Sequence, residues 1–190
     1  MHLYKMIQDI PKERILVYDT ETTGLYPGRD EILQFSACDG TGHVLLNTYI
    51  RPKKMKEWPD AAAVNGITPD MVQNSPTMEV IRDCIQNLFD HAYLLVAYNA
   101  NFDDSFLREA GIRLRKGSKS FDVMKVFAEV YGEWNDYFGD YKWQKLTTAA
   151  SYYDFNWGSC KAHDSMGDVF ATLHVFNCLL GEMRSKEERT

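Results

Sequence analysis

Two short, uninterrupted apolar runs, at residues 15–18 and 93–98, constrain the fold of this 190-residue chain more than any other feature. Both are too short for a buried helix and match the length of a buried strand. The second run is followed by a segment typical of a helix, from Phe102 to Ala110, which Gly111 ends. Strands that alternate with helices in this way predict an α/β fold.

The rest of the chain fits the same fold class. Residues 32–38 and 43–50 predict two more strands, and the Asp-Gly pair between them favours a tight turn and thus an antiparallel meander. A single hydrophobic core stops growing only at about 250–300 residues, so this chain fits one core. We therefore expect a single domain with a mixed sheet of about five strands, over residues 1–190, with 1–12 and 185–190 at its periphery.

Helices are expected on either side of this sheet. Apolar residues recur with helical spacing over 81–88, and Ser75 is the expected N-cap, with Pro76 in the first helical position. Later elements are expected as a short strand at Phe121, helices near 123–131 and 143–153, and a last helix capped by Asp164.

Composition bounds the class and the partners. Apolar residues make up 45% of the chain and charged residues 25%, which is typical of a folded globular protein. The chain has no apolar run of the about 18 residues needed to span a bilayer and no apolar stretch at its start typical of a secretion signal, so we expect a cytoplasmic protein without a membrane partner. The net charge of −6 argues against nucleic acid unless acidic groups hold cations. Basic residues gather at 51–56 and 108–119, as either a solvated face or a phosphate track.

Two carboxylates, Asp19 and Glu21, directly follow the first apolar run. Their spacing places both side chains on one face of a strand. The Thr-Thr-Gly turn after them offers backbone N–H groups to a ligand. Such a pair fits a hard divalent cation, although acidic pairs near turns commonly just meet solvent.

Further polar groups follow at two later points. Asn99 and Asp103 come after the second apolar run, where open α/β sheets form their ligand crevice, so Asp103 should point toward Asp19. His163 and Asp168 flank the start of the last helix. Taken singly, these groups also suit a helix cap, an acid in a first turn or a surface histidine.

Together, the three segments resemble the motifs of the DEDDh branch of the 3′-to-5′ exonucleases. This is the family of the epsilon proofreading subunit of bacterial DNA polymerase III, ribonuclease T and oligoribonuclease. Residues 19–24 match its first motif, Asn-x-x-Phe-Asp at 99–103 its second, and His-x-Ser-x-x-Asp at 163–168 its third. Ser165 replaces the usual alanine, and Asn65 stands where a histidine often precedes Gly-Ile-Thr.

The resemblance implies a ribonuclease H-like architecture and a set of roles. Two divalent cations, Mg²⁺ or Mn²⁺, would be held by four carboxylates: Asp19, Glu21, Asp103 and Asp168. His163 would be the general base, since an ordinary histidine pKa of about 6.5 suits proton transfer near neutral pH. Substrate contacts are implied at Thr22, Thr23, Gly24, Leu25, Asn65, Asn99 and Phe102. For Phe102, packing in the core is an equally good interpretation.

The implied activity is release of nucleoside 5′-monophosphates from a free 3′ end. We expect DNA, single-stranded or frayed, as the substrate, with RNA as the alternative because recognition of the 2′-hydroxyl cannot be read from one sequence. A non-catalytic module that binds nucleic acid or a polymerase, and a phosphatase or small-nucleotide hydrolase, stay open as other classes. A polymerase or another protein partner also stays open.

An aromatic-rich stretch spans residues 131–157. Nucleic-acid bases stack on such rings for about 1–3 kcal/mol each, so a single-strand platform is one interpretation. We favour packing in helices and loops, because acidic residues between the rings would repel a phosphate backbone. A subunit contact is a third interpretation.

Overall fold

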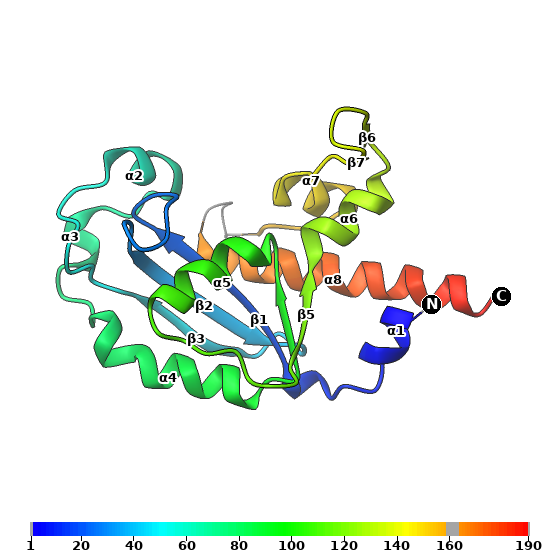
Figure 1. Cartoon of the computed structure of the whole chain (residues 1–190), viewed down its shortest axis with the longest axis horizontal. Helices are drawn as coiled ribbons and strands as arrows, with labels where there is room; N and C mark the ends of the chain where they lie inside the picture. The colour runs from blue at the N-terminus through cyan, green and yellow to red at the C-terminus, as the bar shows by residue number, and fades with distance from the viewer. Residues whose placement is uncertain (1, 159–163, 190) are drawn as a thin grey trace.

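The computed structural model describes residues 2–158 and 164–189 and contains a five-stranded mixed sheet (Figure 1). The strand order is β3-β2-β1-β4-β5. Strand β1 pairs in parallel with β4, which pairs in parallel with β5, whereas β2 and β3 are antiparallel. The strands are β1 (Ile15–Thr22), β2 (Ile32–Asp39), β3 (Val44–Tyr49), β4 (Leu94–Ala97) and β5 (Lys119–Asp122). The predicted α/β fold with a mixed five-stranded sheet is confirmed.

Helices and one small hairpin occupy the connections between the strands. Their bounds are α1 (His2–Ile7), a 3₁₀ turn (Lys12–Arg14), α2 (Pro59–Asn65), α3 (Pro69–Val72), α4 (Met78–His91), α5 (Ala100–Glu109), α6 (Val123–Tyr131), the hairpin strands β6 (Trp134–Asn135) and β7 (Asp140–Tyr141), α7 (Leu146–Tyr152) and α8 (Ser165–Glu187). No helix in the part of the chain that the structure describes combines the length and the apolar character needed to cross a membrane.

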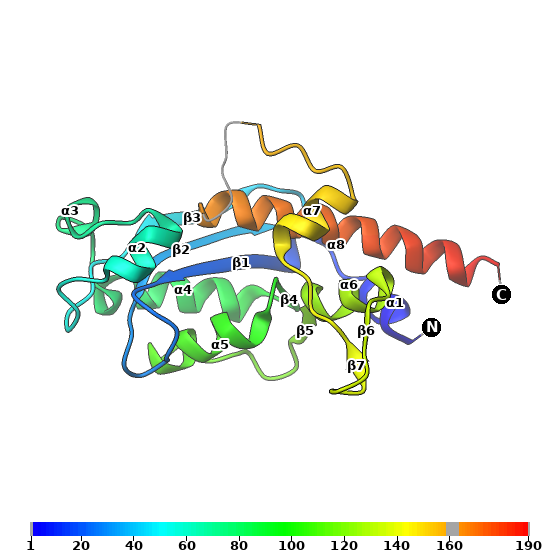
Figure 2. The same ribbon diagram turned by 90° about the horizontal axis from the view of Figure 1, so that it is seen from above.

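Strand β1 divides the interior into two apolar layers. Ile15 and Val17 point to the face covered by α6 and α8, whereas Leu16 and Tyr18 point to the face covered by α4 and α5. This is the side-chain alternation of a pleated strand. Figure 2 shows α8 on one side of the sheet and α4 and α5 on the other. A third, smaller cluster around Trp58 lies beneath α2 and α3.

The predicted start of the helix after Ser75 is wrong by about two residues. Helix α4 begins at Met78, with Thr77 in the N-cap position and no side-chain cap. The cause lies outside the local sequence: the Pro76 carbonyl accepts a hydrogen bond from the Arg51 backbone at 2.9 Å, and Thr77 forms a parallel bridge with Arg51. Tertiary pairing therefore keeps residues 76 and 77 extended.

The observed starts of α7 and α8 can be compared with the predicted ones. The helix expected over 143–153 begins only at Leu146, because the preceding residues run back from the β6–β7 hairpin, where Lys142 donates its backbone N–H to Glu133 at 2.8 Å. The last helix begins at Ser165 directly after Asp164, as predicted. It continues through the charged stretch as far as Glu187.

Phe89 provides a test of the core on the α4 side. Its ring is fully buried, 5.0 Å from the Tyr18 ring and 6.4 Å from the Phe35 ring. We expect Phe89→Ala to lower the free energy of unfolding by about 3–5 kcal/mol in urea denaturation, because it removes buried apolar contacts and leaves a cavity. Val80→Ala, in the same helix but 73% exposed, is the control and should change it by no more than about 0.5 kcal/mol.

Candidate active site

The site begins where β1 extends beyond its neighbour β4. Strand β1 pairs with β4 only over Ile15–Val17, yet it continues to Thr22. The backbone edge of β1 is therefore open after Val17. Asp103, near the start of α5, takes the place of the missing strand: its Oδ1 accepts the Thr20 backbone N–H at 2.9 Å and the Thr20 hydroxyl at 2.7 Å.

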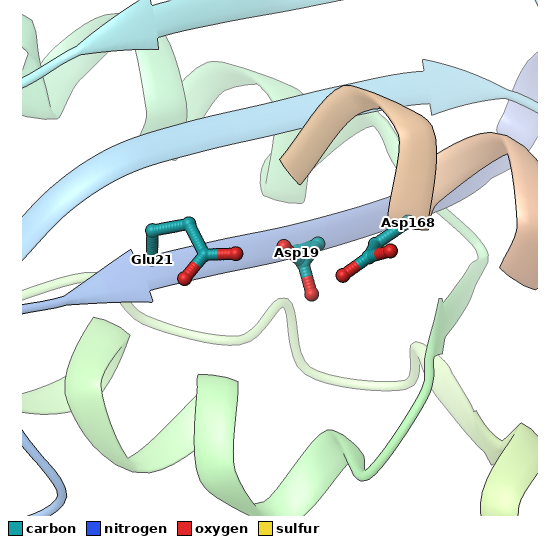
Figure 3. A group of neighbouring side chains, drawn as sticks. All are labelled: Asp19, Glu21 and Asp168. Atoms are coloured by element: carbon teal, nitrogen blue, oxygen red, sulfur yellow. The ribbon is translucent and has the colours of Figure 1, made fainter. Parts of the chain in front are cut away.

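Three carboxylates converge at this end of β1, on the face that points toward the start of α8 (Figure 3). Asp19, Glu21 and Asp168 each offer one oxygen, and these three atoms lie within 4.8 Å of one another. The pleat of β1 directs Asp19 and Glu21 to the face where α8 begins. Ser165 holds the start of α8 against β1, because its hydroxyl donates to the Asp19 carbonyl at 3.2 Å.

This cluster carries more negative charge than a recessed site tolerates alone. Burial, followed by the charge of Asp168, raises the pKa of Asp19 to about 7. Burial and the charges of Asp19 and Asp168 raise the pKa of Glu21 to about 9. Asp19 Oδ2 is buried without a hydrogen-bond partner among the residues that the structure describes. An orphaned carboxylate oxygen among acids that resist ionisation fits a bound cation, and hard oxygen ligands suit Mg²⁺ or Mn²⁺.

Asp103 is not among the three carboxylates whose oxygens lie within 4.8 Å of one another in the described part of the chain. It is only 2% exposed, and burial followed by the charge of Asp19 raises its pKa. Its neighbour Asp104 faces the α4–α5 layer, where it accepts the Tyr18 hydroxyl at 2.6 Å. The two adjacent acids therefore have separate surroundings, and Asp103 is the one next to the acidic cluster.

His163, the predicted general base, lies outside the described residues. The same third motif also contains Ser165 and Asp168, which the structure does describe. Both lie in the first turns of α8, where Asp168 is 9% exposed and Ser165 is fully buried.

The Thr22–Leu25 turn forms a tight, fixed loop after β1. The Thr22 hydroxyl donates to the Gly24 carbonyl at 2.6 Å. Beneath the turn, the buried Asp30 accepts the Tyr26 backbone N–H at 2.9 Å. A Cβ on Gly24 would stand 2.5 Å from an Asp30 carboxylate oxygen, so only glycine fits there. Leu25 points outward and is 73% exposed.

A cavity of about 600 Å³ opens beside the turn. Its lining includes five of the predicted substrate contacts, which lie on β1, on the turn after it and on α2: Thr22, Thr23, Gly24, Leu25 and Asn65. Phe102 also lines it, although its half-buried ring packs against Phe106 at 4.9 Å, so Phe102 belongs both to the core and to the cavity wall. Asn65 joins the walls, since its amide donates to the Thr22 carbonyl at 3.2 Å.

Asn99 does not line this cavity. It occupies the turn between β4 and α5 with φ +66° and ψ +53°, a left-handed conformation that asparagine tolerates better than most residues. The structure thus gives Asn99 a role in turning the chain into α5, which brings Asp103 to Thr20.

Sequence reasoning missed the second wall of the cavity. Residues between β3 and the end of α2 form it, including Met55 and Trp58, whose indole N–H donates to the Ile67 carbonyl at 2.7 Å. It also missed Asp30 and Glu31 beneath the turn. Trp58, a tryptophan within a mostly polar loop, was the only local signal in the sequence. It did not indicate which other segment this loop faces.

The favoured interpretation of the aromatic stretch is packing in helices and loops, and in the hairpin this packing leaves several rings exposed. Tyr137 and Phe138 at its tip are 88% and 75% exposed, and Trp134 and Trp143 are also exposed. The rings pack mainly on one another, as Tyr137 does on Phe138 at 4.8 Å. The tip is fixed by Asn135, whose side chain accepts the Tyr137 backbone N–H at 3.0 Å. A two-stranded hairpin has no second layer in which to bury these rings.

Comparison with known proteins places these residues in a family. The RNase_T family model, described as exonuclease, matches residues 16–176. An uncharacterized exonuclease of Escherichia phage 186 is 34% identical over 177 residues, which cover 88% of each chain. A DNA polymerase III subunit epsilon-like protein of Rhodobacter capsulatus is 30% identical over 187 residues, which cover 93% of this chain and 25% of that protein.

Solved structures share the fold. Escherichia coli exonuclease I in complex with a dT13 oligonucleotide matches with a TM-score of 0.70 and 22% identity over 91% of this chain and 42% of that one. Exonuclease X in complex with 5′-overhanging duplex DNA matches with a TM-score of 0.65 and 20% identity over 88% of this chain and 92% of that one. The chain spans only about two fifths of exonuclease I. Likeness at this level of identity shows the fold, and the family model and the phage relative show the family: the chain belongs to the DEDDh family of 3′-to-5′ exonucleases.

Proposed function

We propose that this protein removes nucleoside 5′-monophosphates one at a time from the 3′ end of DNA, single-stranded or frayed, with divalent cations as cofactors. The observation that carries this proposal is the position of Glu21. It belongs to the cluster of three carboxylates and also lines the 600 Å³ cavity beside them. A nucleotide in that cavity would have its phosphodiester next to the acids.

Four carboxylates are proposed to hold two Mg²⁺ or Mn²⁺ ions. Asp19, Glu21 and Asp168 already converge, and Asp103 lies at the same strand end. Their four negative charges would balance two divalent cations. When bound, such ions supply positive charge that offsets the charge developing on the phosphate and make nearby water more acidic.

His163 is proposed as the general base. It would accept the proton of the attacking water, whose oxygen forms the new bond to phosphorus. The bond from phosphorus to the 3′ oxygen of the preceding nucleotide breaks, and that oxygen takes up a proton from solvent. The products are a shortened strand with a 3′ hydroxyl and a nucleoside 5′-monophosphate. A carboxylate engaged with cations is a poor proton acceptor, so the histidine is the better candidate.

The cavity is proposed to receive the terminal nucleotide. Backbone groups of the turn at Thr22, Thr23 and Gly24 would meet its 3′ hydroxyl, and Leu25 and Phe102 would contact the base. Asn65 would contribute a polar contact where the family often has a histidine. Asn99, which does not line the cavity, is retained as a contact only through the resemblance of the second motif.

DNA is the proposed substrate because structural neighbours are exonuclease I and exonuclease X in complex with DNA. RNA is the alternative that the test below separates. A polymerase as partner is suggested by relatives named as DNA polymerase III epsilon-like protein and DNA polymerase III PolC-type of Bacillus subtilis. The chain spans a quarter or less of the length of either relative, so we propose a polymerase complex only on the names of these relatives.

The raised pKa values predict a pH dependence of stability in the metal-free protein. An acid with a raised pKa in the folded state keeps a proton that the unfolded chain releases. Its stabilising contribution is therefore complete below the unfolded pKa of 3.8 and is lost as the pH rises to about 7 at Asp19. In EDTA, the Tm of the wild type should fall between about pH 5 and pH 8, and that of Asp19→Asn should fall less.

The same variant tests cation binding. Mn²⁺ added at about pH 8 should raise the Tm of the wild type, because only the folded state assembles the site, and should raise that of Asp19→Asn much less. Asp83→Asn, whose side chain is almost fully exposed in α4, is the control and should behave as the wild type does. Equal Mn²⁺ shifts in all three proteins would contradict the metal assignment.

Removal of the proposed base should separate chemistry from cation binding. We expect His163→Ala to lower kcat by a factor of about 10²–10⁴, while its Tm still rises with Mn²⁺ as in the wild type. His43→Ala, on the exposed β2–β3 turn, is the matched control and should keep full activity. A rate unchanged in His163→Ala between about pH 7 and pH 8 would remove the base assignment.

A panel of oligomers of one sequence, labelled at the 5′ end, tests the substrate. With Mg²⁺ we expect single-stranded DNA to shorten stepwise from its 3′ end faster than duplex DNA or RNA, and EDTA to stop the reaction. Faster shortening of RNA would overturn the choice of DNA but not the mechanism. Products from internal cuts or from the 5′ end would contradict the proposal as a whole.

A further inference from the structure

We propose that Glu31 is a positioning residue that sets the separation of the two walls of the nucleotide cavity and thereby the affinity for the terminal nucleotide. The inference rests on the proposed function and goes beyond it, because Glu31 belongs to none of the three motifs. It neither lines this cavity nor belongs to the acidic cluster.

The two walls come from different parts of the chain. The first wall is the turn after β1, residues 22–30. The second wall is the segment between β3 and the end of α2, residues 55–65. The walls are not strand neighbours, so the width of the cavity depends on side chains that join them.

Glu31 is bonded to both walls at once. Its backbone carbonyl accepts the Thr23 N–H at 2.8 Å, and its own N–H donates to the Thr23 hydroxyl at 2.9 Å. Its carboxylate reaches the other wall at Met55 and the two residues just before that wall: Oε1 accepts the Lys53 backbone N–H at 2.9 Å, and Oε2 accepts those of Lys54 and Met55, each at 2.8 Å. Met55, which lines the cavity, is thus held by the residue that also holds the turn.

An ionised carboxylate is the group that suits this position. Three converging N–H donors need an acceptor with two oxygens, and hydrogen bonds to a charged acceptor are about twice as strong as neutral ones. Glutamine would offer one acceptor oxygen, and its NH₂ group would face N–H donors. Aspartate is one methylene shorter and would not reach the loop.

The rest of the second wall is held independently. Asn65 bonds to Thr22 at the far end, and the Trp58 indole bonds to the Ile67 carbonyl in the third core cluster. Loss of the Glu31 carboxylate should therefore free residues 53–55 without unfolding the domain. Two of the three N–H groups are exposed, so water can replace the lost acceptor there.

The role of Glu31 is tested by comparing Glu31→Ala and Glu31→Gln with a matched control, Glu79→Ala. Glu79 is an exposed carboxylate of α4 that forms an ion pair with the Lys53 side chain, so its removal takes a negative charge from beside the same loop without touching the backbone bonds. Two quantities are measured: kcat and KM on single-stranded DNA, and the rate of tryptic cleavage after Lys53, Lys54 and Lys56.

We expect Glu31→Ala to raise KM about three- to tenfold with kcat within about twofold of the wild type, and to accelerate tryptic cleavage in this loop. Glu31→Gln should lie between the wild type and Glu31→Ala in both quantities. Glu79→Ala should match the wild type in KM. A purely structural role would lower Tm and the amount of active enzyme without raising KM.

An unchanged KM in Glu31→Ala overturns the proposal, and so does a loss confined to kcat. Tryptic cleavage needs no substrate, so it judges the contact between Glu31 and the loop separately from the activity. If the wild type shows no nuclease activity, the proposed function fails, and calorimetric binding of thymidine 5′-monophosphate with Mn²⁺ replaces KM as the measure. Equal affinity in the wild type and Glu31→Ala would then overturn the role of Glu31.

Discussion

The layout of the site depends on a mismatch in strand length. Strand β1 continues for five residues after its last pairing with β4, so its edge on the β4 side is open there while its other edge stays paired with β2. Asp103 satisfies the edge through Thr20, and Asp19 and Glu21 occupy the face toward α8. A longer β4 would cover the edge with backbone and leave no place for a carboxylate from α5.

This geometry places several acids close together in partly buried positions, which raises their pKa values. The raised pKa values of Asp19 and Glu21 mean that ionisation at neutral pH works against the folded state unless positive charge is supplied. The cations proposed for this site would supply that charge.

The two walls of the cavity beside the acids are held in place in different ways. The turn after β1 is fixed by Gly24 packing on Asp30, whereas the second wall is attached through Asn65, Trp58 and Glu31. The proposed contacts to the terminal nucleotide would thus depend on groups that are remote from the acids.

The fold class and the family could be predicted from the sequence alone. Apolar runs of strand length predicted β1 and β4, and the order of the three motifs indicated the family, because both signals are local and survive in the one-dimensional chain. Only the tertiary structure decided where α4 begins, since Arg51 pairs with Pro76 across 25 positions of sequence, and which faces of the hairpin stay exposed. It also decided which three acids meet within 4.8 Å and that Glu31 bonds to both Thr23 and Met55. Those outcomes depend on hydrogen bonds and packing between segments far apart in the chain, which leave no periodicity in the sequence.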